Sequence, residues 1–146
     1  MRAWGLETQC AEPRDHSPAL TAVCTPEGHS ADRLRGIILL DALYSEMDKF
    51  AAWIERRESA FFFSAYSRSA RDENAGLQRM LTERGVHFAT SLPARLAPGS
   101  VTFLATAEDV VHVEFVTKAW VDDPLRVVLA KIPGYPRTPP PKVRKR

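Results

Sequence analysis

The segment GIILLD, residues 36–41, decides the expected fold of this chain. Four consecutive apolar residues, two of them β-branched, precede a carboxylate, which is typical of a strand buried on both faces of a parallel sheet. Two further apolar runs, at residues 60–66 and 101–105, predict strands of the same kind. Because helical patterns separate these runs, we expect an α/β fold, a small and mostly parallel sheet with helices on both faces.

Helical spacing of apolar residues predicts four helices, with capping residues at their ends. Ser69 is expected to cap the second helix and Asp123 the fourth, whereas residues 86–88 alternate and predict a brief strand. The predicted helices cover residues 45–57, 69–84, 113–120 and 123–132.

The two ends of the chain differ in composition from the region between them. Residues 1–34 contain prolines and no sustained period, so we expect a loosely ordered N-terminal extension with a short helix near residues 20–23. The α/β domain is expected over residues 35–133, and residues 134–146 form a Pro-rich basic tail.

The charge of the chain is unevenly distributed. It has 146 residues and a formal net charge of +2, but residues 137–146 contain five Lys and Arg and no acidic residue. The remainder is therefore mildly acidic, and no specific nucleic-acid partner is expected. A sheet of three or four strands leaves an edge exposed, so we expect self-association through that edge.

The composition and motifs of the sequence also indicate where the protein is located and whether it binds a cofactor. No apolar run approaches the ~18–20 residues that cross a bilayer, and the first residues lack the pattern of a secretory leader. Cys10 and Cys24 are too few for a disulfide framework, so a cytoplasmic location is expected. The four histidines lack metal-ligand spacing and the sequence has no glycine-rich phosphate loop, so neither a metal nor a cofactor is expected.

Polar side chains follow each predicted strand. Asp41 comes after the first strand, Asp72 after the second and His112 after the third. Since ligands bind beyond the carboxyl ends of parallel strands, these side chains are candidates for one site. An acid followed by a histidine is also the chain order in some nucleophile–acid–histidine triads.

Four segments carry a resemblance to a known family. They are RGIILLDALY at 35–44, FFFSAYS at 61–67, NAGLQRMLTERGV at 74–86 and VTFLATAEDVVH at 101–112. Together they resemble the last three core strands in the C-terminal half of α/β-hydrolase superfamily proteins of the bacterial esterase or peptidase kind. The resemblance covers about two thirds of the chain and implies a partial α/β-hydrolase fold, truncated or rearranged.

The resemblance implies a role for each candidate residue. His112 is the expected general base, and Asp72, or alternatively Asp41, is the acid that orients it. Asp72 also suits the first turn of a helix, where a carboxylate interacts favourably with the helix dipole. Ser30, in the segment GHS at 28–30, is the expected nucleophile. In the family, the nucleophilic serine lies in an elbow, a sharp turn from strand into helix with a small residue two places after the serine. Asp32 occupies that place in this sequence. We therefore expect Ser30 to lie far from His112.

The function implied by the resemblance is that of a serine hydrolase. Its substrate would be a small molecule with an ester, amide or similar acyl bond. Because the early strands of the family are missing, we expect weak activity or none. The alternative is a non-catalytic remnant that acts as a binding or assembly module.

Overall fold

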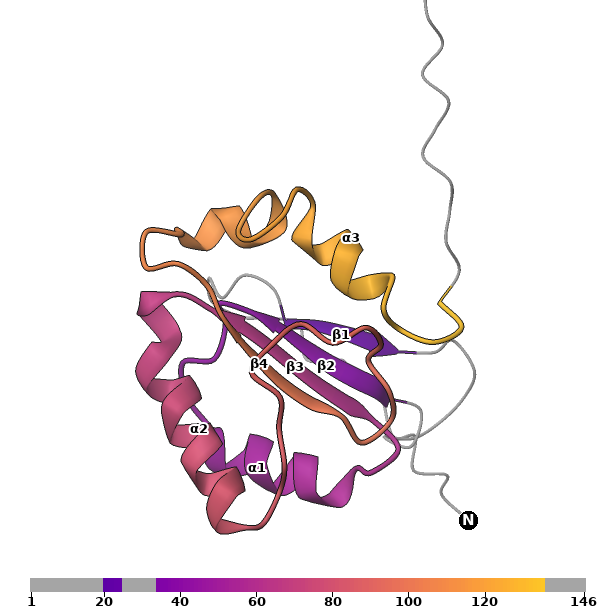
Figure 1. The fold of residues 1–146 in the computed structure, drawn as a ribbon. Helices are drawn as coiled ribbons and strands as arrows, with labels where there is room; N and C mark the ends of the chain where they lie inside the picture. The colour runs from indigo at the N-terminus through magenta and orange to yellow at the C-terminus, as the bar shows by residue number, and fades with distance from the viewer. Residues whose placement is uncertain (1–19, 25–33, 136–146) are drawn as a thin grey trace, which may run out of the picture.

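The computed structural model describes residues 20–24 and 34–135. Its sheet contains four strands in the spatial order β1-β2-β3-β4. β2, β3 and β4 run parallel, and β1 lies antiparallel against β2 (Figure 1). The strands are β1 (Leu20–Cys24), β2 (Leu34–Leu40), β3 (Phe61–Tyr66) and β4 (Val101–Ala105). The prediction of a small α/β fold with three adjacent parallel strands is therefore confirmed.

Strand β1 corrects the prediction of a short helix near residues 20–23. Its backbone pairs Leu20 with Leu39 and Cys24 with Leu34. The open edge of β2 presents backbone N–H and C=O groups that need partners, and an antiparallel neighbour supplies them. This pairing outweighs the weak local preference of a five-residue segment. The rest of the predicted extension, 1–19 and 25–33, and residues 136–146 of the predicted tail lie outside the described residues.

The helices are divided between the two faces of the sheet. α1 (Met47–Arg56) connects β2 to β3, and α2 (Arg71–Glu83) connects β3 to β4. Both cover one face, as right-handed crossovers in the strand order β2-β3-β4 require. The 3₁₀-helix η3 (His112–Val116) and the helix α3 (Pro124–Leu129) cover the other face (Figure 1).

The start of α2 differs from the prediction. A 3₁₀-helix, η2 (Arg68–Ala70), precedes it, and the N-cap position is Ala70, which makes no side-chain capping bond. Ser69 does not cap the helix because its hydroxyl donates to a carboxylate across the sheet edge, described below. A buried polar pair holds this end of α2 on the sheet. Ser64 Oγ of β3 donates to Asn74 Oδ1 at 2.7 Å, and Asn74 Nδ2 donates to the carbonyl of Ala70 at 2.6 Å.

Two other local predictions are also corrected. The helix expected over 113–120 is the shorter 3₁₀-helix η3. Residues 86–88 form no strand, and the parallel bridge to β4 occurs at Ala89, which pairs with Thr102. In contrast, Asp123 caps α3 as predicted and accepts a hydrogen bond from the N–H of Arg126 at 3.3 Å. Self-association through a sheet edge is still a prediction. At one edge of the parallel strands, β1 pairs with β2. At the other edge, Ala89 pairs with one residue of β4, Thr102.

Two apolar layers, one on each face of the sheet, form the core. Successive residues of a strand point to opposite faces, so Phe62 packs toward α1 and α2 while Phe61 and Phe63 pack toward η3 and α3. All three rings are almost fully buried. Burial of each such side chain stabilises the fold by about 1.5–3 kcal/mol.

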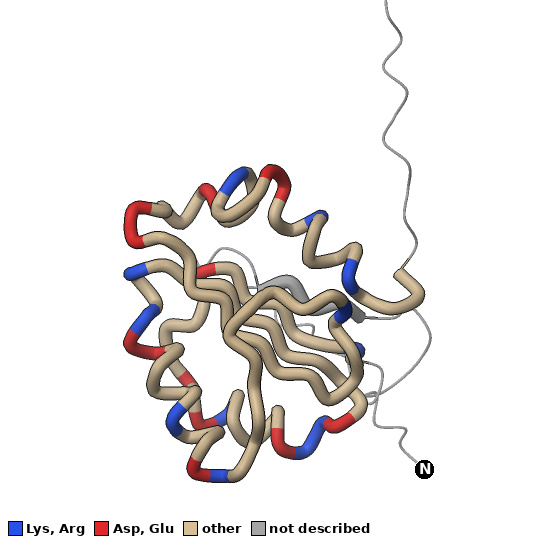
Figure 2. Tube along the Cα trace, viewed as in Figure 1, with Lys and Arg blue, Asp and Glu red and all other residues tan. Residues whose placement is uncertain are grey.

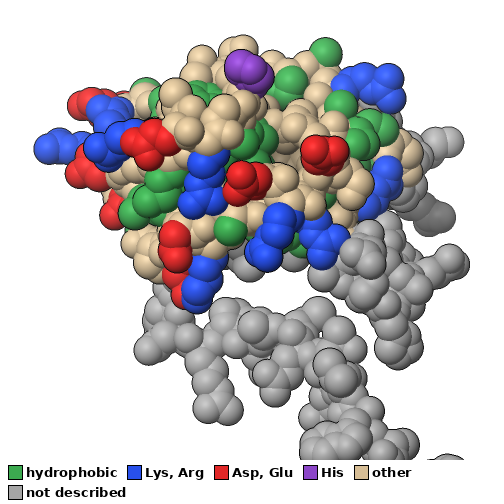
Figure 3. Space-filling view, turned by 90° about the horizontal axis from the view of Figure 1, so that it is seen from below, with side chains coloured by type: hydrophobic (Ala, Val, Ile, Leu, Met, Phe, Trp, Pro, Cys, Tyr) green, Lys and Arg blue, Asp and Glu red, His purple; other side chains and the backbone are tan. Residues whose placement is uncertain are grey.

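Charged residues surround this core. β3 and β4 contain none, and Figure 2 shows Lys, Arg, Asp and Glu on the helices and loops around the sheet. Seen from below, the side that carries α1 shows side chains of both signs intermingled (Figure 3). This mixed arrangement is typical of a solvated surface.

Gly36 of β2 provides a test of how closely the sheet packs. A Cβ at this position would lie 2.5 Å from Cδ1 of the Phe61 ring. We expect Gly36→Ala to lower the free energy of unfolding by about 1–3 kcal/mol, because the buried ring has little room to move. Urea denaturation followed by circular dichroism measures the change. Adding Phe61→Leu, which removes the clashing ring edge, should make the alanine less costly. Equal stability of Gly36→Ala and the wild type would contradict this packing.

Candidate functional site

An aspartate and a histidine meet at the edge of the sheet where the parallel strands end. Asp41 directly follows β2, and His112 begins η3, which follows β4. Asp41 Oδ2 lies 3.1 Å from His112 Nδ1, across 71 residues of sequence. The Asp41 side chain is completely buried, whereas 33% of the His112 side chain is exposed. One partner is therefore held inside the fold, and the other reaches solvent.

The carboxylate of Asp41 is saturated by hydrogen bonds from the segment after β3. The backbone N–H and the hydroxyl of Ser67 both donate to Oδ1, each at 3.0 Å. The Ser69 hydroxyl donates to Oδ2 at 2.7 Å, the same oxygen that contacts His112. Since a buried carboxylate is costly unless it is fully hydrogen-bonded, these donors explain how Asp41 is accommodated.

The backbone of Asp41 adopts an uncommon conformation. Its φ angle is +50°, in the left-handed region that few non-glycine residues occupy. Its N–H continues the sheet ladder for one more step and donates to the carbonyl of Ala65 at 2.7 Å. Aspartate tolerates this conformation better than bulkier residues do. β2 thus ends in a sharp turn beside the end of β3.

The hydrogen bonds decide the charge of Asp41. Burial raises the pKa of this carboxyl, but the bonds from the Ser67 N–H, the Ser69 hydroxyl, His112 and the Ser67 hydroxyl together lower it below its usual 3.8. Asp41 is therefore ionised at neutral pH and acts only as an acceptor. In the neutral imidazole, a proton on His112 Nδ1 is donated to this carboxylate, and Nε2 then has a free lone pair. That arrangement is the one a histidine general base requires.

Tyr44 provides a second hydroxyl beside the histidine. Its phenolic oxygen lies 3.4 Å from His112 Nδ1. Burial raises the pKa of this hydroxyl above its usual 10.0, and the negative charge of Asp41 raises it further. Tyr44 is therefore neutral at physiological pH and contributes a polar tip on an apolar ring.

The structure brings together only some of the predicted site residues. His112 lies against Asp41, the alternative acid. Asp72 is an exposed residue in the first turn of α2, and no hydrogen bond or ion pair joins it to His112. Ser30 lies outside the described residues, so its predicted distance from His112 stays untested. The strand ends that flank it in sequence, Cys24 and Leu34, pair with each other at the edge opposite Asp41.

Sequence reasoning missed the role of Ser69 and the double contact of Ser67. The signal that identifies them is the spacing Ser-x-Ser directly after a buried strand whose neighbour ends in aspartate. A serine at the start of a helix predicts a cap in most proteins. Here its hydroxyl serves the neighbouring segment instead.

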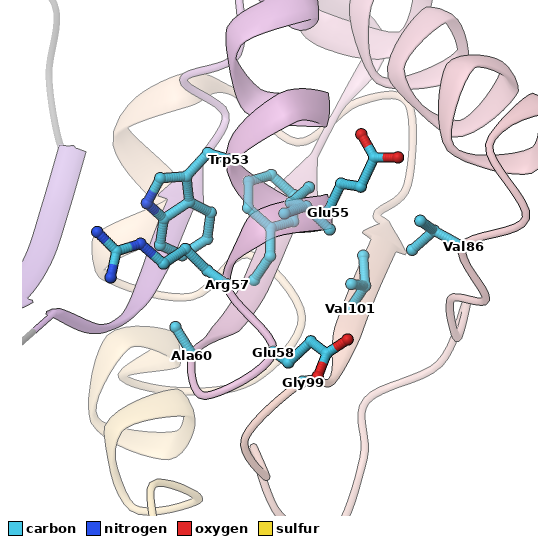
Figure 4. A pocket seen from close by; sticks show the side chains of 10 residues that line it. Trp53, Glu55, Arg57, Glu58, Ala60, Val86, Gly99 and Val101 are labelled. Atoms are coloured by element: carbon cyan, nitrogen blue, oxygen red, sulfur yellow. The ribbon is translucent and has the colours of Figure 1, made fainter. Parts of the chain in front are cut away.

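A pocket of about 290 Å³ lies at the opposite edge of the sheet, where β3 and β4 begin (Figure 4). Figure 4 shows the Trp53 ring on one side and the Glu55 and Glu58 carboxylates on the other. Glu55 is paired with Arg84 at 3.1 Å. None of the described lining residues is His, Ser or Cys, so this pocket offers neither a histidine base nor a serine or cysteine nucleophile.

The described residues contain neither a cluster of metal-ligating side chains nor a helix that could span a membrane. Within residues 20–24 and 34–135, no three His, Cys, Asp or Glu side chains are arranged to hold a metal ion. Over the same part of the chain, no helix has the length and apolar character needed to cross a bilayer.

No family model, curated protein or solved structure matches this chain.

The lowered pKa of Asp41 predicts a pH-dependent contribution to stability. A carboxyl whose pKa is depressed in the folded state stabilises the fold above its unfolded pKa, and this contribution is lost as the pH falls through the folded pKa. We expect Asp41→Asn to lower the free energy of unfolding by about 1–3 kcal/mol at pH 7. Below pH ~4 this difference should narrow, because the wild-type carboxyl then approaches the neutral state of the amide. Urea denaturation at a series of pH values measures both effects.

Asp72→Asn is the matched control for this experiment. It makes the same chemical change at an exposed carboxylate, so its effect should be no more than about 0.3–1 kcal/mol. A gap between wild type and Asp41→Asn that is independent of pH would contradict the assignment of an ionised, buried Asp41.

Proposed function

We propose that this chain is a hydrolase of the α/β-hydrolase type that acts on an ester, amide or similar acyl bond. The observation that supports the proposal is the contact between buried Asp41 and partly exposed His112, 3.1 Å apart beyond the carboxyl ends of parallel strands. In this proposal His112 is the general base and Asp41 orients it. Asp41 takes this role instead of Asp72 because only Asp41 contacts the imidazole.

The geometry supports a defined order of proton transfers. His112 Nε2 accepts a proton from the attacking hydroxyl as that oxygen bonds to the acyl carbon. Asp41 then stabilises the imidazolium, which has Nδ1–H and Nε2–H, without itself taking a proton. When the acyl bond breaks, Nε2 returns the proton to the leaving group.

On the resemblance of the GHS segment to the family's elbow, Ser30 is the candidate nucleophile. Because its neighbours Cys24 and Leu34 pair at the sheet edge opposite Asp41, the geometry supports the acid–base pair alone, and labelling of Ser30 tests the nucleophile. The serines closest to the pair, Ser67 and Ser69, donate their protons to Asp41 and not to His112. Their oxygens are therefore not activated by the imidazole. They hold the acid in place.

Hydrolysis of an activated ester tests this function. Because the early strands of the family are missing, we expect the purified chain to hydrolyse p-nitrophenyl acetate weakly, at a rate just above that of the buffer. His112→Ala and Asp41→Asn should each reduce this turnover to the buffer rate, because general-base catalysis contributes about 10²–10⁴-fold. His87→Ala is the control, since His87 is an exposed histidine remote in sequence from the pair. Labelling by a fluorophosphonate probe should disappear in Ser30→Ala.

Circular dichroism on each variant separates loss of function from loss of fold. A folded wild-type chain with no turnover, or turnover that His112→Ala leaves unchanged, would overturn the proposal. Those results would favour the non-catalytic binding or assembly module.

A further inference from the structure

A second pocket, also about 290 Å³ in volume, lies where the chain leaves α3 beside the start of β2. Residues 94–95 and 130–135 line it, and we call it the basic pocket. Its two charged lining residues, Arg95 and Lys131, are both cations. Arg35, at the start of β2, precedes Asp41 by six residues, which is about 20 Å at the rise of a strand. The basic pocket is therefore separate from the Asp41–His112 pair.

Hydrogen bonds and core residues hold the walls of the basic pocket in place. The N–H of Leu96 donates to the carbonyl of Lys131 at 2.9 Å, which ties the two lining segments together. Arg35 Nη2 donates to the carbonyl of Pro133 at 2.6 Å, which ties the second segment to β2. The side chains of Leu96 and Ile132 are buried in the core layer beneath η3 and α3. The pocket is therefore preformed.

A tight turn forms one wall of the basic pocket. The N–H of Tyr135 donates to the carbonyl of Ile132 at 3.2 Å. Pro133 occupies the second position of the turn, and Gly134 occupies the third with a φ angle of +74°. These are the features of a type II turn. A Cβ on Gly134 would lie 3.8 Å from Arg35 Nη2, so the Arg35 guanidinium lies directly beside this wall.

Hydrogen-bond acceptors around the basic pocket are used within the fold, whereas cationic donors are not. Five successive or nearly successive carbonyls each accept a hydrogen bond, those of Val128, Leu129, Lys131, Ile132 and Pro133. Within the described part of the chain, the side chains of Arg95 and Lys131 make no hydrogen bond or ion pair. Positively charged N–H groups are therefore available to a ligand in the pocket.

The segments that form the basic pocket contain no acidic residue. Neither Asp nor Glu occurs in residues 34–40, 86–107 or 124–135. Figure 2 shows Lys and Arg, without Asp or Glu, along the chain where α3 ends beside the sheet. In sequence, residues 137–146 follow with five further Lys and Arg and no acid. The electrostatic potential at the pocket is therefore positive and attracts anions.

We propose that the basic pocket binds the phosphate group of a phosphate monoester, with the rest of the ligand against Tyr135. At neutral pH such a phosphate has a charge of about −1.5 to −2 and three terminal oxygens. The planar guanidinium of Arg95 can bind two of these oxygens at once, and the ammonium of Lys131 adds a second positive charge. The Tyr135 side chain is 40% exposed and offers a ring to an adjoining apolar group. This inference does not depend on the proposed hydrolysis.

Titration of the full chain with phenyl phosphate tests the inference. In the ¹⁵N-labelled wild type, the backbone NMR signals of residues 94–96 and 131–135 should shift saturably. Sodium chloride at the same ionic strength should not shift them. Benzoate, which has a ring but a single negative charge, should bind with a Kd about fivefold higher or more. Arg95→Gln and Lys131→Gln should each raise the Kd for phenyl phosphate by about threefold to tenfold.

Arg79→Gln is the matched control for these two variants. Arg79 is an exposed residue of α2 that also makes no hydrogen bond or ion pair with a described residue. The substitution removes the same charge from another part of the surface, so the Kd should stay within about twofold of the wild type. Circular dichroism checks that each variant is folded.

Tyr135→Ser separates the two parts of the ligand. It should raise the Kd for phenyl phosphate by about threefold, because the ring contact is lost. The Kd for inorganic phosphate should stay within about twofold, because the cations that bind the phosphate are unchanged.

Vesicles identify the source of the phosphate. Phosphatidic acid presents a phosphate monoester as its headgroup. Co-sedimentation of the wild type with vesicles of phosphatidylcholine and phosphatidic acid, weakened by Lys131→Gln but not by Arg79→Gln, would assign the site to a lipid headgroup. Absence of this pattern, with phenyl phosphate bound as expected, would assign it to a soluble phosphate ester.

Four results would overturn the inference. They are the absence of a saturable shift with phenyl phosphate, equal affinity for benzoate, equal weakening by Arg79→Gln and Arg95→Gln, and tighter binding of a single-stranded oligonucleotide to the same residues. The last result would make the pocket part of a surface for a nucleic-acid backbone. None of these measurements requires turnover, so their outcome is independent of whether the proposed hydrolysis occurs.

Discussion

The buried carboxylate of Asp41 joins three segments that the chain separates widely. It belongs to the end of β2, accepts hydrogen bonds from Ser67 and Ser69 after β3, and contacts His112 after β4. A desolvated charge is costly, and only this complete set of donors offsets the cost. The carboxyl edge of the sheet therefore has one arrangement in which Asp41 is satisfied, and that arrangement fixes where the histidine lies.

The rest of the fold supports this arrangement. Parallel pairing of β2, β3 and β4 brings their carboxyl ends to one edge. The buried Ser64–Asn74 pair holds the start of α2 against β3 and so positions η2, which carries Ser69. On the opposite face, burial of Phe115 holds η3 against the sheet and places His112, three residues earlier, toward Asp41.

The two edges of the sheet differ in chemical character. The amino edge holds a pocket whose described lining lacks a histidine or a nucleophile, and its carboxylate Glu55 is paired with an arginine. The carboxyl edge holds an ionised acid and a partly exposed base. The proposed hydrolase activity depends on this edge.

The sequence by itself determined the parallel strands and the helices α1, α2 and α3. Each of these elements is buried on one or both faces, and burial requires apolar residues at the positions that face the core. The apolar runs of the strands and the helical spacing of apolar residues are therefore visible in the sequence. It also identified His112 and Asp41 as candidates, since polar residues at the carboxyl ends of parallel strands share one edge.

Only the tertiary structure decided the remaining features. β1 is a strand because the edge of β2 needs a partner, which no local pattern in residues 20–24 reveals. Asp41 rather than Asp72 meets the histidine because a left-handed turn ends β2 beside β3, whereas Asp72 begins an exposed helical turn. Ser69 donates to Asp41 instead of capping α2 because a buried carboxylate needs a donor more than an exposed helix end does. Each of these outcomes depends on groups distant in sequence, and only the folded chain brings those groups together.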